Sequence, residues 1–210
     1  LLDGTAGLFQ GPRQVTPTTH RTILLALYGA GLRAGEALRL RLTDADLRRR
    51  ILTIWNSKFH KSRLVPIGRS LTVAFERHLE ERSTFSMPEG DRSAFFATRR
   101  GLPINLQWLE KSFSELRKKG GILGFGERRH IRHPRLHDLG HAFAVHRLVA
   151  WYRAGLDVQT RLAWLSTYLG HASIEGTQTY LSMTHELLSE ASARFERYAC
   201  PDKETEICHD

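Results

Sequence analysis

Residues 51–68 read ILTIWNSKFHKSRLVPIG, and their pattern differs from that of the rest of the chain. Residues 51–55 are rich in β-branched, aromatic and other apolar side chains, and Asn56-Ser57 is a turn signal. Residues 63–67 form a second run of the same kind. This order predicts a β-hairpin. Its basic side chains are Lys58, Lys61 and Arg63.

Helical spacing of apolar residues dominates on both sides of this hairpin. The first predicted helix begins at about Thr18, ends at Gly29 and Gly31, and has one apolar face made of Ile23, Leu24, Leu27 and Tyr28. Further helices are predicted over 34–40, 70–82, 105–118, 137–153, 157–169, 174–182 and 185–199. The stretch 40–42 is a candidate third strand. The fold class is therefore mixed α+β, mainly α-helical with a small antiparallel sheet.

The composition predicts one domain between two loose ends. Residues 1–17 are rich in Gly, Thr and Pro and read as a linker or arm, and residues 201–210 read as a flexible tail. The domain between them covers 18–200, and with 41% hydrophobic residues the chain can bury a core. The sequence begins Leu1-Leu2 without methionine, so we expect a longer parent protein. No stretch approaches the roughly 18 apolar residues of a membrane span.

Charge points to a polyanionic partner. The chain has 31 Lys and Arg against 22 Asp and Glu, which gives a net charge of +9. Cations that neutralise backbone phosphates release counterions, so this balance suits nucleic acid, although a merely basic protein is the alternative. The two cysteines, Cys200 and Cys208, are too few for a disulfide framework and fit a reducing, intracellular compartment.

Four segments carry residues with chemical potential. They are GLRAGEALRL (31–40), KFHKSRLVPIG (58–68), HDLGHAFA (137–144) and YLGHASIEGTQTYL (168–181). In this order the chain resembles the catalytic domain of the tyrosine recombinase (phage integrase) family. The residues that match the family's motifs are Arg33, Glu36, Lys58, Lys61, Arg63, Val65, Pro66, His137, Leu139, His141, Leu169, Gly170, His171 and Tyr180.

The resemblance implies a catalytic role for several of these residues. Tyr180 would attack the scissile phosphate and form a 3′-phosphotyrosyl intermediate, which conserves bond energy so that no ATP, metal or other cofactor is needed. Arg33 would hold the non-bridging oxygens with its planar fork, and Lys58 would protonate the leaving 5′-oxygen. His137 would relay the tyrosine proton or orient the phosphate, and His171 would hydrogen-bond a phosphate oxygen. We interpret Glu36 as a structural partner of Arg33 or the backbone.

Other cations are predicted to contact the DNA. Lys61 and Arg63 would touch the phosphate backbone or else lie on a solvated strand face, and the loop arginines Arg132 and Arg135 would line the same channel. Family members assemble as dimers and tetramers on double-stranded DNA. The helix predicted over 185–199 would dock on a neighbouring protomer, or else pack within its own domain. The expected location is the cytoplasm, in association with the nucleoid, without membrane contact.

Gly140 departs from the family pattern. The family carries its second catalytic arginine at this position, three residues after His137. An arginine supplied to a phosphoryl-transfer transition state is worth about 10³–10⁵ in rate. We therefore expect impaired cleavage. Gly140 either replaces arginine in an active enzyme or marks a DNA-binding homologue that cuts weakly or not at all.

A histidine cluster supports a second enzyme class. His130, His133, His137, His141 and His146 lie within 17 positions, and His137 and His141 have the i, i+4 spacing of helical metal ligands. A metal-dependent hydrolase is therefore an alternative, although the sequence has no H-E-x-x-H motif. A type IB topoisomerase is a neighbour in chemistry, and the hairpin and L-G-H…Y spacing favour a recombinase.

Overall fold

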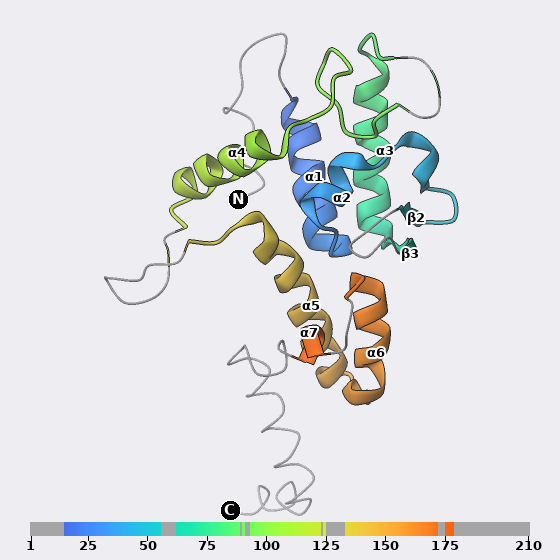
Figure 1. Cartoon of the computed structure of the whole chain (residues 1–210), viewed down its shortest axis with the longest axis vertical. Coiled ribbons are helices and arrows are strands. Elements are labelled where there is room, and N and C mark those ends of the chain that lie inside the picture. The colour runs from blue at the N-terminus through green and yellow to red at the C-terminus, as the bar shows by residue number, and fades with distance from the viewer. Residues whose placement is uncertain are drawn as a thin grey trace, which may run out of the picture. The chain divides into compact units, whose positions relative to one another are not determined.

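The structure is a computed structural model that describes residues 15–55, 62–88, 90, 93–122, 124, 133–171 and 175–178 (Figure 1). The chain divides into two compact units, Leu1–Phe143 and Ala144–Asp210. Its elements in chain order are α1 (Pro17–Ala30), α2 (Ala34–Arg39), η2 (Leu42–Asp44), β1 (Ala45–Asp46), β2 (Ile51–Ile54), β3 (Arg63–Pro66), α3 (Arg69–Ser83), α4 (Leu106–Lys119), α5 (Leu136–Arg153), α6 (Val158–Leu169) and α7 (Glu175–Gln178). A mainly helical chain with a small antiparallel sheet is confirmed.

Helix α1 begins and ends where its local chemistry dictates. The Thr16 hydroxyl accepts a hydrogen bond from the Thr19 backbone N–H at 3.0 Å, and Pro17 occupies the first helical position. The helix ends at Gly31, whose φ of 59° lies in the left-handed region that favours glycine. Of the predicted apolar face, Ile23, Leu24 and Leu27 are buried, whereas Tyr28 is 42% exposed.

The predicted hairpin is confirmed. Strands β2 and β3 pair antiparallel with Leu52 opposite Val65, and both of these side chains are fully buried. The third strand is β1, which pairs with β2, so the sheet order is β1-β2-β3. The expectation of a strand at 40–42 was wrong. The Asp44 carboxylate accepts the Arg41 backbone N–H at 2.8 Å and turns the chain there, and Arg41 makes only an isolated bridge to Ala94.

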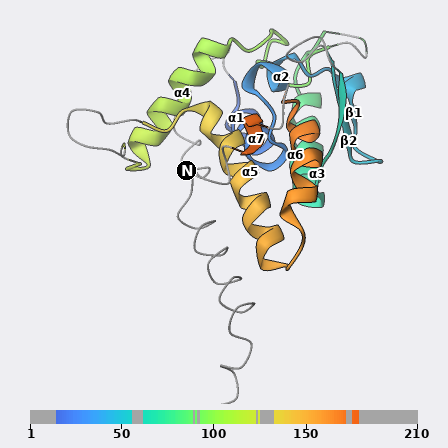
Figure 2. The same ribbon diagram turned by 60° about the horizontal axis from the view of Figure 1, so that its bottom comes forward.

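The core of the first unit is built from α1, α3 and the segment that follows α3. Helices α1 and α3 lie side by side, and the sheet lies beside α3 in two views (Figure 1 and Figure 2). Phe75 of α3 packs against Phe95 and Phe96 with ring centroids 5.0 and 6.0 Å apart. The buried His78 ring stacks on the same two phenylalanines.

The second unit contains most of α5, all of α6 and the short helix α7. Asp157 caps α6 through the backbone N–H groups of Gln159 and Thr160, and Gly170 ends it with φ 66°. The helix predicted over 174–182 is confirmed for 175–178, and its remainder lies outside the described residues, as do the helix predicted over 185–199 and the tail. None of the helices in the described ranges has the length and apolar character that crossing a bilayer requires.

Candidate active site

Glu36 lies at the centre of a buried cluster of charges. Its side chain is 2% exposed, and it accepts hydrogen bonds from two arginines. Oε1 accepts from Nη1 of Arg33 at 2.8 Å and from Nη1 of Arg63 at 2.9 Å. Oε2 accepts from the backbone N–H of Arg33 at 3.0 Å and from Nη2 of Arg63 at 2.9 Å. One carboxylate therefore ties the start of α2 to strand β3.

The charge on Glu36 is maintained by these contacts. Burial alone would raise the pKa of the carboxyl group, since it disfavours the charged form. The hydrogen bond from Arg63, that from the Arg33 backbone and the charges of both arginines outweigh burial and hold the pKa of Glu36 below its ordinary value. The carboxylate stays ionised at neutral pH and fixes both guanidinium groups. The interpretation of Glu36 as a structural partner of Arg33 is confirmed by this geometry.

Arg63 is held inside the protein. Its side chain is 8% exposed and donates to both oxygens of Glu36 in the fork geometry of a bidentate pair. The alternative of a solvated strand face was therefore wrong for Arg63. A contact from Arg63 to DNA stays a prediction. Arg33, by comparison, has 28% of its side chain exposed while paired with the same carboxylate.

The first turns of α5 bring residue 140 close to the turn that precedes Arg33. A Cβ atom added to Gly140 would have the backbone carbonyl oxygen of Gly31 as its nearest neighbour, at 4.0 Å. That distance is an ordinary van der Waals contact, so a side chain at position 140 has room. Gly31 is two residues before Arg33 in the chain. An arginine at position 140 would therefore start beside the segment that carries Arg33.

His137 and His141 lie one helical turn apart on α5. Their rings meet edge to face with centroids 4.3 Å apart, and His137 is the more exposed. Burial is the largest cause that lowers the pKa of His141. The neighbouring His137 lowers it further, Asp138 raises it and Arg135 lowers it. The ring of His141 therefore favours its neutral form, in which one ring nitrogen is able to accept a proton.

The metal-site alternative finds little support in the described part of the chain. No three His, Cys, Asp or Glu side chains gather there as metal ligands would. His133 is turned toward α4, where its Nδ1 accepts a hydrogen bond from Nη1 of Arg117 at 2.9 Å. His130 lies outside the described residues.

His171 follows the left-handed cap of α6 in the second unit. Its backbone N–H donates to the Ser166 carbonyl at 3.0 Å, which completes the end of the helix. Its Nδ1 lies 2.8 Å from the hydroxyl of the fully buried Thr177. The ring of His171 is therefore held in one orientation by a contact within its own unit.

Of the remaining predicted site residues, the structure describes only Arg135. Lys58, Lys61, Arg132 and Tyr180 lie outside the described residues, so their roles stay predictions. Arg135 is 76% exposed at the start of α5, with its guanidinium 3.7 Å from Asp138.

Two contacts, one in each unit, were missed in the sequence analysis. The pairing of Arg63 with Glu36 had a signal, because alternate residues of a strand share a face and Arg63 is two positions before the buried Val65. The contact of Thr177 with His171 had none, since nothing in the local sequence directs a hydroxyl six positions away to an imidazole.

Comparison with known proteins shows which family the chain belongs to. Residues 8–186 match the model of the phage integrase family. The integrase/recombinase y4rB of Sinorhizobium fredii is 36% identical over 184 residues, which are 88% of this chain and 58% of that protein. Tyrosine recombinase XerC of Chlorobaculum parvum is 31% identical over 189 residues, 85% of this chain and 49% of that one.

A solved structure of a recombinase is also similar to this chain. The crystal structure of XerA recombinase matches with a TM-score of 0.67 at 26% identity, covering 85% of this chain and 58% of that one. The chain therefore belongs to the phage integrase family, as the four motifs predicted. It spans about half the length of the curated relatives that it matches.

Proposed function

We propose that this chain is the catalytic part of a site-specific DNA recombinase or integrase that cuts and rejoins DNA through Tyr180. The observation that carries the proposal is the buried Glu36 carboxylate, which holds Arg33 of the family motif in a fixed position. Relatives of the chain are named as integrases and tyrosine recombinases. A fixed guanidinium with part of its surface exposed suits the non-bridging oxygens of a phosphodiester.

The reaction would proceed in two transesterification steps. The Tyr180 oxygen attacks the scissile phosphorus, the bond to the 5′-oxygen breaks, and a 3′-phosphotyrosyl ester forms. Lys58 protonates the leaving 5′-oxygen, and His137 takes the proton of the phenol. In the second step a 5′-hydroxyl attacks the ester and releases Tyr180, so the bond count is conserved. Arg33 and His171 hold the phosphate oxygens throughout.

Gly140 favours a second candidate function. A chain with one guanidinium where the family has two would still bind DNA through its other cations, because phosphate contacts position the duplex without doing chemistry. Cleavage would suffer more than binding, since the lost contact is strongest in the transition state. The second candidate is thus a DNA-binding homologue that cuts weakly or not at all.

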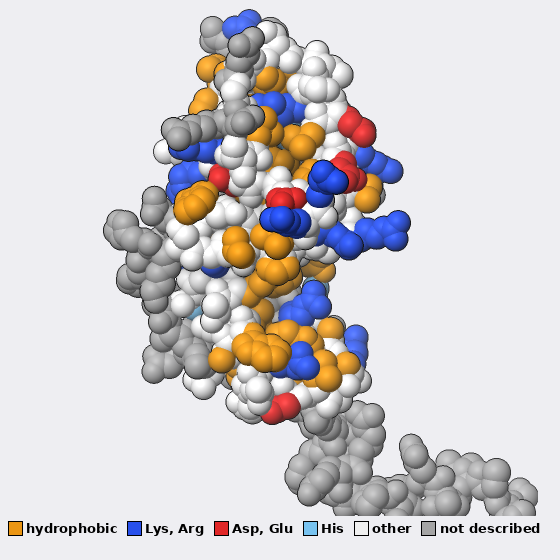
Figure 3. All heavy atoms as spheres, turned by 90° about the vertical axis from the view of Figure 1, so that its right-hand side faces the viewer, with side chains coloured by type: hydrophobic (Ala, Val, Ile, Leu, Met, Phe, Trp, Pro, Cys, Tyr) orange, Lys and Arg blue, Asp and Glu red, His pale blue; other side chains and the backbone are white. Residues whose placement is uncertain are grey.

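Charge supports double-stranded DNA as the partner for both candidates. The net charge is +9, and Lys and Arg side chains are spread over the face displayed in Figure 3 with fewer acidic ones among them. Assembly into dimers or tetramers on DNA follows from the family, and a cytoplasmic, nucleoid-associated location follows from the substrate.

Covalent trapping decides between the candidates. The chain and its Gly140→Arg variant are incubated with a suicide duplex whose nicked strand leaves after cleavage. A protein–DNA adduct that disappears in Tyr180→Phe establishes the recombinase reaction. Duplex binding without an adduct from either form would establish the DNA-binding homologue, and absence of binding would contradict both.

A further inference from the structure

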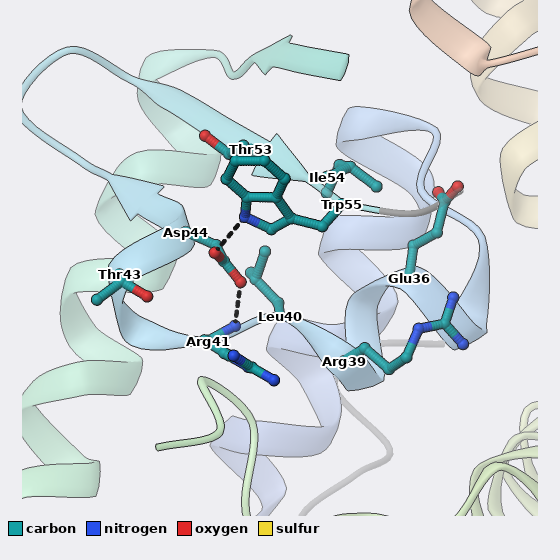
Figure 4. A pocket seen from close by; sticks show the side chains of 9 residues that line it. All are labelled: Glu36, Arg39, Leu40, Arg41, Thr43, Asp44, Thr53, Ile54 and Trp55. Atoms are coloured by element: carbon teal, nitrogen blue, oxygen red, sulfur yellow. Dashed lines mark hydrogen bonds between the residues drawn. The ribbon is translucent and has the colours of Figure 1, made fainter. Parts of the chain in front are cut away.

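A pocket of about 660 Å³ lies beside the charged cluster, between α2, η2 and strand β2 (Figure 4). Glu36 forms part of its wall. The other lining residues with polar or aromatic side chains are Arg39, Arg41, Thr43, Asp44, Thr53 and Trp55.

Trp55 is presented to solvent in a fixed orientation. Its side chain is 60% exposed, yet its indole Nε1–H donates to Oδ1 of Asp44 at 2.8 Å. Asp44 is buried, and its other oxygen accepts the backbone N–H of Arg41 at 2.8 Å. The ring is thus oriented before any ligand arrives. Exposed but preorganised aromatic side chains are typical of binding surfaces, because their ordering cost is already met.

The pocket also carries two arginines that pair with no acidic side chain of the described residues. Arg39 and Arg41 are exposed, and neither takes part in the ion pairs within 4.0 Å that the described residues form. The two acidic side chains that line the pocket already accept hydrogen bonds from other groups. Glu36 is bound by Arg33 and Arg63, and Asp44 accepts two N–H groups. The pocket therefore offers two cations, an aromatic face and threonine hydroxyls.

We propose that this pocket binds one strand of the DNA duplex next to the scissile phosphate. Arg39 and Arg41 hold a backbone phosphate, and the ring of Trp55 packs on the adjoining deoxyribose. This inference rests on the proposed function.

The position of the pocket favours a polymer over a small anion. Glu36 lines the pocket and also holds Arg33, so the two sites share a wall. A strand carries a phosphate about every 3.4 Å along the helix axis. A strand whose scissile phosphate meets Arg33 therefore brings its next phosphates toward the pocket.

Salt dependence of duplex binding tests the cations. The double variant Arg39→Gln/Arg41→Gln should reduce the slope of log affinity against log salt by about one, for one lost phosphate contact. The matched control is Arg77→Gln, which removes an exposed arginine of α3 outside the pocket and should keep the wild-type slope.

Three further variants test the ring. Trp55→Ala should weaken duplex binding by up to about tenfold, the low end of the effect of aromatic side chains that stack on bases of single strands, because a deoxyribose offers a smaller contact than a base. Asp44→Asn keeps the shape of the side chain but removes one of its two hydrogen-bond acceptors. It should weaken duplex binding less than Trp55→Ala does. The intrinsic fluorescence change on adding duplex should be lost in Trp55→Phe, while the other three tryptophans remain. Circular dichroism melts establish that each variant is folded.

The outcomes separate this inference from the proposed function. If folded variants keep wild-type affinity, slope and fluorescence response while the parent binds duplex and the trapping assay succeeds, the pocket inference is wrong and the recombinase proposal stands. If the parent does not bind duplex, both fail. Reduced slope and affinity in the pocket variants alone support the pocket.

Discussion

We predict that Gly140 limits the rate at which this chain cleaves DNA. The point where a Cβ of residue 140 would lie has the Gly31 carbonyl oxygen as its nearest neighbour, at 4.0 Å, so the first atom of a side chain fits there. We expect Gly140→Arg to raise the rate of Tyr180–DNA adduct formation by at least about a hundredfold, a conservative part of the effect of a transition-state arginine. Affinity for duplex should change little. Single-turnover trapping on a suicide substrate measures the rate, and filter binding measures the affinity.

The control for this prediction is Gly140→Ala. Alanine improves the helix by about 1 kcal/mol but brings no charge, so stability should rise without a gain in rate. Equal rates for glycine and arginine forms would mean that another cation already fills the role, or that Tyr180 is not the nucleophile.

Arg63 contributes to stability through Glu36. Replacing it by an apolar residue of similar length leaves a buried carboxylate with Arg33 alone. We expect Arg63→Met to lower the free energy of unfolding by about 3 kcal/mol, the low end for breaking a buried pair, because one partner remains. Urea unfolding measures the loss.

The double variant Arg63→Met/Glu36→Gln provides the control. With the buried charge also removed, the loss should be clearly smaller than the sum of the two single losses. Full additivity would contradict a direct pairing between Glu36 and Arg63.

At the scale of elements, the end of α1 sets the position of Arg33. Gly31 has φ 59°, whereas Gly29 lies inside the helix with only the side chain of Leu71 near an added Cβ, at 3.6 Å. We expect Gly31→Ala to lower the free energy of unfolding by about 1–2 kcal/mol, since a Cβ is strained in the left-handed region. Gly29→Ala should raise it by up to about 1 kcal/mol. Thermal unfolding of both variants distinguishes a cap from a helical position, and equal shifts would contradict the assignment.

At the scale of the whole molecule, the net charge of +9 predicts salt-sensitive DNA binding. Each phosphate contact contributes about 0.9 to the slope of log affinity against log salt, so several contacts make the affinity fall steeply. Filter binding at several salt concentrations measures the slope. A flat response would rule out the proposed electrostatic contact with the backbone.

Two buried histidines predict a loss of stability in acid. Burial lowers the pKa of His20 to about 4, against 6.5 for the ordinary group, and burial is also the largest cause that lowers the pKa of His78. Between about pH 4 and pH 6.5 the unfolded chain binds more protons at His20 than the folded chain does. The contribution of neutral His20 to the free energy of unfolding is therefore fully present above about pH 6.5 and is lost as the pH falls. For His20 the loss amounts to roughly 2 kcal/mol by about pH 5.

Urea unfolding at about pH 7.5 and pH 5 tests this. His20→Gln, which keeps a hydrogen-bonding group near the Ser112 hydroxyl that lies 3.0 Å from Nε2, should remove most of the His20 contribution. A parent chain with equal stability at both pH values would contradict a neutral, buried His20.

The sequence by itself determined the hairpin, the helices of the described ranges and the family. These features depend on local signals: the β-type runs at 51–55 and 63–67, the helical spacing of apolar residues, and four motifs in one order along the chain. The misplaced third strand marks the limit of such signals. The turn at Asp44 depends on one side chain capturing one backbone N–H, which apolar spacing does not report.

Only the tertiary structure decided which side chains far apart in the sequence meet. Glu36 and Arg63 are 27 positions apart in the chain and form a bidentate pair, while Trp55 is oriented by Asp44. Such contacts arise because a buried carboxylate must find donors wherever the fold brings them. Their partners are therefore set by the packing of α2 against the sheet, and no short stretch of sequence contains that information.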